Sequence, residues 1–248
     1  MRTEERLQEE KRIVRENGYT EYVDLYKLIT DHARSVRKPV LVKGRINYSY
    51  LAYTLGITAV DPTERDYPME MAFGYHMDRI PDMSLGIPLS YDKPLTEYLE
   101  SQFGKEHVTR DESSIKVGGI KLHVFISDLL DAVDSGIPDL SSVDISDGRL
   151  LRALGRIHGR GIGDHARFFT RDDIYRYVLG LGADAKTAYD IMEYARKGKG
   201  SDSRTQTLLN ELGAGPGEIE QIGKIKYMAW EADLIPEAKL MSYILGTV

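Results

Sequence analysis

The hydrophobic periodicity of this chain changes once, across a stretch rich in Ser, Asp, Gly and Pro at residues 134–148. Before this stretch, helical spacing is mixed with strand-like alternation, as in Ile120–Ile126. After it, apolar residues recur at helical spacing almost throughout, and Thr170 stands where a helix N-cap is expected. We therefore predict an α+β region at residues 1–140 and an all-α region at residues 141–248.

Composition limits the class of protein. With 248 residues, 42% of them hydrophobic, the chain is long enough to bury a substantial core. It contains no cysteine, which excludes disulfides, thiol nucleophiles and cysteine-ligated metals. Its apolar runs are far shorter than the roughly 20 residues of a membrane span, and its charged N-terminus lacks a signal-peptide core. We expect a soluble, cytoplasmic protein with no membrane partner.

The net charge of −6 is unevenly distributed. Residues 1–150 hold 19 basic and 26 acidic residues, whereas residues 151–248 hold 14 and 13. Within residues 149–176 there are seven arginines and three acidic residues. Arginine suits bidentate phosphate contact, but such a run is also typical of a solvated helix face. Both interpretations stay open on composition alone.

One segment carries a possible metal site. In an extended strand, residues i and i+2 face the same way, so an Asp-x-Asp strand presents two adjacent carboxylates that can hold Mg²⁺. In Asp82-Met83-Ser84 the second position is a serine, which brings no charge. Taken alone, this segment reads as a polar turn after Pro81.

Two basic segments could contact phosphate. The segment Lys43–Ser49 lies between an expected strand and an expected helix, where backbone amides can bind an anion, but close approach would favour glycine at Ile46. In Arg196–Gly200 three cations alternate with two glycines. The second pattern fits helix C-capping and a phosphate-contacting loop equally well.

Seven sequence blocks resemble one family in the same order along the chain. That family has R-D-D-I, R-K-G-K-G and K-I-K-Y-M motifs in its last three blocks. The matching blocks here are Leu41–Arg45, Ile57–Pro62, Pro68–Asp82, Leu151–Gly159, Arg171–Leu179, Ala188–Gly200 and Lys224–Met228. In these blocks the chain resembles the PolC-type alpha chain of bacterial DNA polymerase III.

The resemblance implies a small palm of the polymerase-beta-like nucleotidyltransferase type, with a shortened thumb at about 89–118, followed by a fingers-like helical region. Its catalytic and metal positions would be Asp82 and Asp144, the second in a remnant of the family's K-L-D-I-L-G strand. Its phosphate or nucleic-acid contacts would be Arg45, Arg171, Arg196, Lys197, Lys199, Lys224 and Lys226.

The chain departs from the family at the sites that matter for chemistry. Ser84 replaces the second palm aspartate, and the family's R-G-S becomes Arg45-Ile46-Asn47. Lys239 stands where the family has a histidine. No counterparts of the exonuclease, PHP and clamp-binding regions are seen, so the expectation is a shortened relative that has lost its metal site.

Three functions follow as alternatives. The first is a catalytically degenerate relative that binds DNA weakly and non-specifically, or binds replication proteins, and needs no cofactor. The second is an active DNA-directed DNA polymerase or nucleotidyltransferase that uses Mg²⁺ at Asp82 and Asp144. The third is a protein-binding module without nucleic-acid affinity. The sequence favours a protein that is not an enzyme and leaves its oligomeric state open.

Overall fold

The computed structural model describes residues 2–133, 140, 143–146, 148–163 and 165–246. Contacts within the chain define two compact units. The first consists of Met1–Val143 with Lys239–Val248, and the second consists of Asp144–Ala238. Whether the chain behaves as two domains divided near residue 140 stays a prediction.

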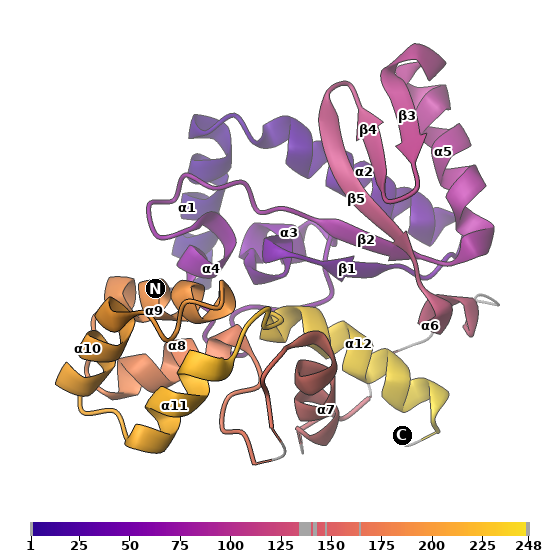
Figure 1. Ribbon diagram of the computed structural model, residues 1–248. Helices are drawn as coiled ribbons and strands as arrows, with labels where there is room; N and C mark the ends of the chain where they lie inside the picture. Colours follow the sequence, from indigo (N-terminus) through magenta and orange to yellow (C-terminus); the bar gives the residue numbers. More distant parts are fainter. Residues whose placement is uncertain (1, 134–139, 141–142, 147, 164, 247–248) are drawn as a thin grey trace. The chain divides into compact units, whose positions relative to one another are not determined.

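A five-stranded mixed sheet forms the centre of the first unit (Figure 1). Its spatial order is β1-β2-β5-β4-β3, with β2 and β5 parallel and the other neighbours antiparallel. The strands are β1 (Leu41–Lys43), β2 (Ser84–Ile87), β3 (Val108–Asp111), β4 (Ser114–Val117) and β5 (Ile120–Ile126). The predicted α+β class and the alternating strand at Ile120–Ile126 are confirmed.

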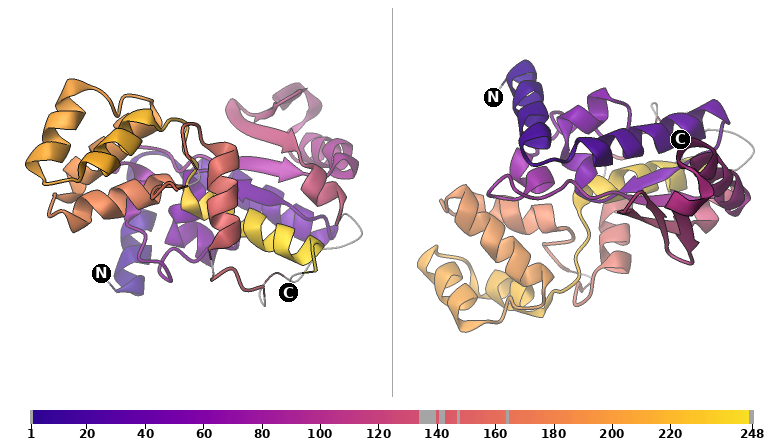
Figure 2. Two further views of the ribbon diagram at one scale, coloured as in Figure 1. Left: turned by 60° about the horizontal axis from the view of Figure 1, so that its bottom comes forward. Right: turned by 90° about the horizontal axis from the view of Figure 1, so that it is seen from above.

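The two faces of this sheet differ in burial. On β5, Leu122 and Val124 are buried, whereas Lys121 and His123 are exposed. The view from above in Figure 2 shows helix α2 (Thr20–Ser35) on one side of the sheet. On β5 the apolar alternate residues therefore face the core and the polar alternate residues face outward. On β1, Leu41 lies on the same side as His123 and is buried in a cluster with Leu130, Val133 and Leu240.

Short helices and turns complete the first unit around the sheet. Helix α5 packs against β3 and β4 and starts at Leu89. Besides α2, the helices are α1 (Thr3–Glu16), α3 (Tyr50–Thr54), α4 (Met69–Phe73), α5 (Leu89–Phe103) and α6 (Asp128–Asp131), with 3₁₀ turns at Arg45–Tyr48 and Lys105–His107.

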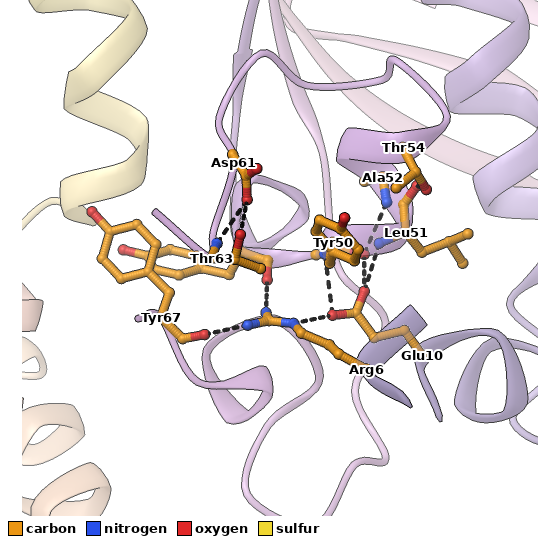
Figure 3. A network of polar contacts seen from close by, with 11 residues as sticks. Arg6, Glu10, Tyr50, Leu51, Ala52, Thr54, Asp61, Thr63 and Tyr67 are labelled. Carbon is orange, nitrogen blue, oxygen red and sulfur yellow. Dashed lines mark hydrogen bonds and ion pairs between the residues drawn. The ribbon is translucent and has the colours of Figure 1, made fainter. Parts of the chain in front are cut away.

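A buried ion pair on α1 organises the loops next to it (Figure 3). Arg6 donates to Glu10 at 2.8 Å and to the backbone carbonyl oxygens of Tyr48 and Tyr67 at 2.8 and 2.6 Å. The Glu10 carboxylate also accepts from the Ser49 hydroxyl at 2.7 Å. Since both charges are out of water, their other polar groups must be satisfied, and these loop contacts do so.

The second unit is built of helices, in agreement with the change in periodicity. The hydroxyl of Thr170 accepts a hydrogen bond from the Asp173 amide, and the Asp173 carboxylate accepts one from the Thr170 amide, so the predicted N-cap is confirmed. Described helices in this part are α7 (Arg149–His158), α8 (Arg171–Gly180), α9 (Ala185–Arg196), α10 (Ser203–Glu211), α11 (Pro216–Lys224) and α12 (Glu231–Ile244), the last of which continues into the first unit.

Across the part of the chain that the structure describes, no helix combines the length and apolar character needed to cross a bilayer.

Candidate functional site

Asp82 lies two residues before the start of β2, and its side chain is 60% exposed. Its backbone carbonyl accepts from the Ile46 amide at 3.1 Å. Gly44, at φ +109°, passes so close that an added Cβ would lie 2.4 Å from the Asp82 carbonyl oxygen. Only a glycine allows this approach, and it ties the segment before β2 to the segment after β1.

The strand pairing surrounds Ser84 with residues that are not acidic. Ser84 is in register with Lys43 on β1 and with His123 on β5. Residues in register on neighbouring strands point to the same face, with Cβ atoms about 4.5–5.5 Å apart. The row beside Asp82 therefore presents a cation, a hydroxyl and an imidazole.

Asp144 does not belong to this sheet. The prediction that Val143–Ile145 is a remnant strand is wrong, because these residues form no strand. The Asp144 carboxylate instead accepts from the amide and hydroxyl of Ser146, at 2.7 and 3.0 Å, in a local turn. Short polar side chains favour such turns over sheet pairing. The partner of β2 is β5, which carries His123.

Arg45 is mostly buried, with its side chain 9% exposed. Its guanidinium donates to the Met71 carbonyl at 3.1 Å and lies 3.9 Å from the Asp82 carboxylate. Within the same turn, the amides of Asn47 and Ser49 donate to carbonyls of the chain. These contacts assign the segment a structural role, and its contact with phosphate stays a prediction.

Glu193 on α9 gathers three of the predicted phosphate-binding cations. Its carboxylate accepts two hydrogen bonds from Arg196, at 3.0 and 2.9 Å, and lies 3.8 Å from the Lys197 amine and 3.9 Å from the Arg171 guanidinium. The Glu193 side chain is only 8% exposed. Part of the positive charge of the R-K-G-K-G block is therefore balanced within the protein.

Arg171 is also held by its surroundings. Its side chain donates to the Met228 carbonyl at 2.7 Å, and its guanidinium lies 4.1 Å from the centroid of the Trp230 ring. This cation–π contact and the 17% exposure of the side chain indicate that Arg171 ties α8 to the segment before α12.

The structure brings together two blocks that are distant in sequence. An added Cβ on Gly198 would lie 3.1 Å from the Lys226 side chain, and Lys226 forms an antiparallel bridge with Arg160. Lys199 and Lys226 are exposed. Lys224 is exposed as well, but it forms an ion pair with Glu220. Exposed positive charge is thus concentrated at Lys199, Lys226 and Arg160.

Sequence reasoning missed Arg160, Tyr227 and His123. The Arg160 guanidinium lies 5.3 Å from the ring centroid of Tyr227, a 59% exposed residue with a positive φ of 58°. A signal for His123 was available, since Lys121-Leu122-His123 aligns with the start of K-L-D-I-L-G better than Val143–Ile145 does. The parallel pairing of β5 with β2 agrees with that alignment, because it places His123 beside Ser84.

Comparison with known proteins finds similarity to bacterial DNA polymerases over part of the chain. Residues 1–121 match the sequence model of the bacterial DNA polymerase III alpha NTPase domain. Over part of its length, the chain is therefore related to the alpha chain of bacterial DNA polymerase III, as the resemblance predicted.

The individual proteins that resemble the chain are bacterial DNA polymerases. DNA polymerase III PolC-type of Clostridium perfringens is 29% identical over 155 residues, which are 57% of this chain and 10% of that protein. The PolC-type protein of Ureaplasma parvum is 39% identical over 75 residues, 30% of this chain and 5% of that protein. Error-prone DNA polymerase of Rhodopseudomonas palustris is 31% identical over 101 residues, 40% of this chain and 9% of that protein. The chain thus spans a tenth or less of each.

Proposed function

We propose that this protein is a catalytically inactive relative of a bacterial replicative DNA polymerase, and that it binds nucleic acid without incorporating nucleotides. The observation that carries the proposal is the row Lys43–Ser84–His123 next to Asp82. Phosphoryl transfer with two metal ions needs carboxylates that converge on both ions. Here the neighbouring strands supply a lysine and a histidine instead.

The residues present do not fit a magnesium site. Mg²⁺ prefers six oxygen ligands in near-octahedral geometry and is usually held by one or two carboxylates together with substrate phosphates. Asp82 has Arg45 and Lys43 as cationic neighbours, and no group of three His, Cys, Asp or Glu residues that could hold a metal ion occurs among the described residues. No catalytic step is therefore assigned to Asp82 or Asp144.

The second unit supplies the proposed contacts with nucleic acid. Lys199 and Lys226 are exposed and lie beside Gly198, whereas Arg171, Arg196 and Lys197 share Glu193. The first two lysines therefore contribute most to phosphate binding. Contacts of this kind are independent of sequence and give dissociation constants of roughly micromolar or weaker at physiological salt.

An oligonucleotide titration tests the binding. Fluorescence anisotropy at low salt with a labelled 20-nucleotide oligothymidylate gives binding that weakens with salt, with a slope of log K against log salt of about −1.4 to −2 for two to three contacts with a single strand. Lys199→Ala with Lys226→Ala flattens this slope. Lys224→Ala, which removes a lysine already paired with Glu220, is the matched control and changes little.

A primer-extension assay tests the inactivity. With a primed template, all four deoxynucleotides and Mg²⁺ or Mn²⁺, we expect no extension. Extension that disappears in Asp82→Ala would establish the active alternative. Absence of oligonucleotide binding at tens of micromolar protein would instead support the protein-binding alternative, with a replication protein as the partner.

A further inference from the structure

The first unit contains a hollow of about 430 Å³ that the proposed function does not use. Its walls come from three elements, namely helix α2, the C-terminal end of helix α5 and the hairpin that joins β4 to β5 (Figure 1). All of its lining residues belong to the same compact unit. Small-molecule sites in proteins are concave and have volumes of about 300–1,000 Å³, so the hollow is large enough for a small organic molecule.

One face of α2 gives the hollow both its charge and part of its apolar lining. Glu21, Asp24, Leu25 and Leu28 all line it. Their spacing of i, i+3, i+4 and i+7 is the spacing of residues on a single helix face. The two acidic residues come first along this face and the two leucines follow, so this wall changes from charged to apolar along the helix.

The other apolar side chains come from the hairpin and from α5. Val117 and Ile120 are in register at the end of the β4–β5 hairpin, so both point to the same side of the sheet. Phe103, the last residue of α5, also lines the hollow and is 39% exposed. Leu28 and Ile120 are only half-buried. Because this apolar surface is in contact with water, covering it with an apolar group is favourable.

The two carboxylates of the hollow have no cationic partner within the described part of the chain. The side chains of Glu21 and Asp24 are exposed, and neither forms a hydrogen bond or an ion pair there. The lysine and the arginine of α2, Lys27 and Arg34, both pair with Asp31 instead. Glu21 lies in the first turn of α2, where an acidic residue also interacts favourably with the helix dipole. The hollow therefore combines an apolar interior with two negative charges.

We propose that this hollow binds a small organic amine with an aromatic or branched apolar body. The apolar body lies against Leu25, Val117 and Phe103, and the ammonium group lies at Glu21 and Asp24. Small-molecule sites have this composition, in which apolar side chains supply most of the contact and a few polar groups fix the orientation. Charge complementarity selects an amine over an acid of the same shape. The site is separate from the proposed nucleic-acid contacts and does not depend on them.

A titration of the full chain with two molecules of the same ring system tests the role of charge. Tryptamine carries an ammonium group, and indole-3-propionate carries a carboxylate on a side chain of similar length. NMR follows binding at the backbone amide of Gly118, which lines the hollow. We expect tryptamine to shift this resonance with a Kd of roughly 0.1–3 mM, as the ligand efficiency of a molecule of this size allows. Indole-3-propionate binds about tenfold more weakly, because two carboxylates repel it.

The charge is then removed from the protein. Glu21→Gln with Asp24→Asn keeps the shape of both side chains, and the preference for tryptamine falls to about twofold or less. Glu4→Gln with Glu5→Gln changes the net charge equally and removes two acidic residues from the first turn of α1, so it is the matched control with an unchanged preference. A loss of stability alone does not alter the ratio of the two affinities, so this ratio separates ligand binding from a purely structural role of Glu21.

The apolar interior has its own measurement. Leu28→Trp fills the hollow and abolishes binding of both molecules, whereas Phe103→Ala removes an exposed part of the lining and weakens both severalfold. Thermal unfolding without ligand shows which variants are folded, and Phe103→Ala decides if Leu28→Trp is not.

Three results overturn the amine site. They are no shift at Gly118 with millimolar tryptamine, equal affinity for the two molecules, and tryptamine binding that is unchanged in folded Leu28→Trp or Phe103→Ala. Because neither molecule contains a phosphate, these results are independent of the oligonucleotide titration, and failure of one proposal leaves the other standing.

Discussion

Ser84 and His123 occupy the same register position on two parallel strands, β2 and β5. Asp82 lies two residues before Ser84, and Met83 between them is buried. Alternation along the strand therefore directs Asp82 and Ser84 to one side, the side to which His123 also points. Two side chains on this face, a hydroxyl and an imidazole, stand where carboxylates would complete a metal site.

This relationship predicts a gain of metal binding. Ser84→Asp with His123→Asp adds two carboxylates beside Asp82, so we expect the variant to bind Mn²⁺ or Mg²⁺ more tightly than the unsubstituted protein does. Isothermal titration calorimetry with Mn²⁺ or Mg²⁺ measures the difference between the variant and the unsubstituted protein. Ser84→Asn with His123→Asn is the uncharged control. A double-aspartate variant that folds but binds no metal would contradict the geometry.

Glu193→Gln is predicted to have opposite effects on stability and on binding. The variant loses the charge-assisted hydrogen bonds to Arg196, so we expect the free energy of unfolding to fall by about 1–3 kcal/mol. At the same time Arg171, Arg196 and Lys197 lose their shared anion, so oligonucleotide binding becomes tighter and more salt-sensitive.

Urea unfolding and anisotropy measure the two effects separately. Glu220→Gln, which removes the exposed partner of Lys224, is the control and changes stability by less than about 1 kcal/mol. Looser binding by Glu193→Gln in a folded protein would show that these cations do not contact nucleic acid.

Glu10→Gln is predicted to be among the most damaging single changes in the first unit. The carboxylate is buried and accepts from Arg6, Ser49 and the Leu51 amide. Its loss leaves a buried guanidinium without its counter-charge, which costs about 3–5 kcal/mol in comparable pairs. Urea unfolding compares it with Glu9→Gln, whose partner Arg12 is half exposed and whose loss costs under about 1 kcal/mol. Similar losses for the two variants would contradict the assignment.

His32 predicts an acid-sensitive contact between α2 and α5. Its ring stacks on Tyr98 at 3.6 Å between centroids, and its Nδ1 lies 2.7 Å from the Tyr91 hydroxyl. Burial lowers the pKa of His32, so the folded state disfavours the protonated ring. The unfolded chain takes up the proton first, near pH 6.5, so stability is fully present above that pH and is lost as pH falls through the lower pKa of the folded state.

Melting temperatures between pH 8 and pH 5 measure this dependence. His32→Phe keeps the stacking on Tyr98 and cannot be protonated, so its melting temperature falls less on acidification than that of the unsubstituted protein. Parallel pH profiles for the two proteins would show that His32 does not contribute.

The local signals in the sequence were reliable where they depend on neighbouring residues. The alternation of Ile120–Ile126 and the cap at Thr170 follow from short-range sterics and hydrogen bonding, and both are confirmed. The linear resemblance also holds, because ordered motifs survive when single functional residues change. These signals were enough to predict the α+β class and the similarity to the alpha chain of bacterial DNA polymerase III over part of the chain.

The partners of each strand could not be predicted in the same way. The resemblance implied a metal site at Asp82 and Asp144, whereas the strand that follows Asp82, β2, lies inside the sheet between β1 and β5. Pairing depends on contacts between residues far apart in the chain, and no local pattern specifies them. The surroundings of Ser84 could not be predicted for the same reason, since Lys43 and His123 are brought beside it only by the pairing of the strands.

The close approach of Gly44 to the Asp82 carbonyl shows that this glycine is required by the path of the backbone and not by the chemistry of the Asp82 side chain. The missing side chain at Gly44 is what permits the chain to pass there at φ +109°, whether or not Asp82 binds a metal. A glycine at this position in any relative therefore reports that the backbone crossing is intact, and it says nothing about activity. Under the proposed function, the residues that distinguish an inactive copy from an active one are those at positions 84 and 123, because they can change while the crossing is kept.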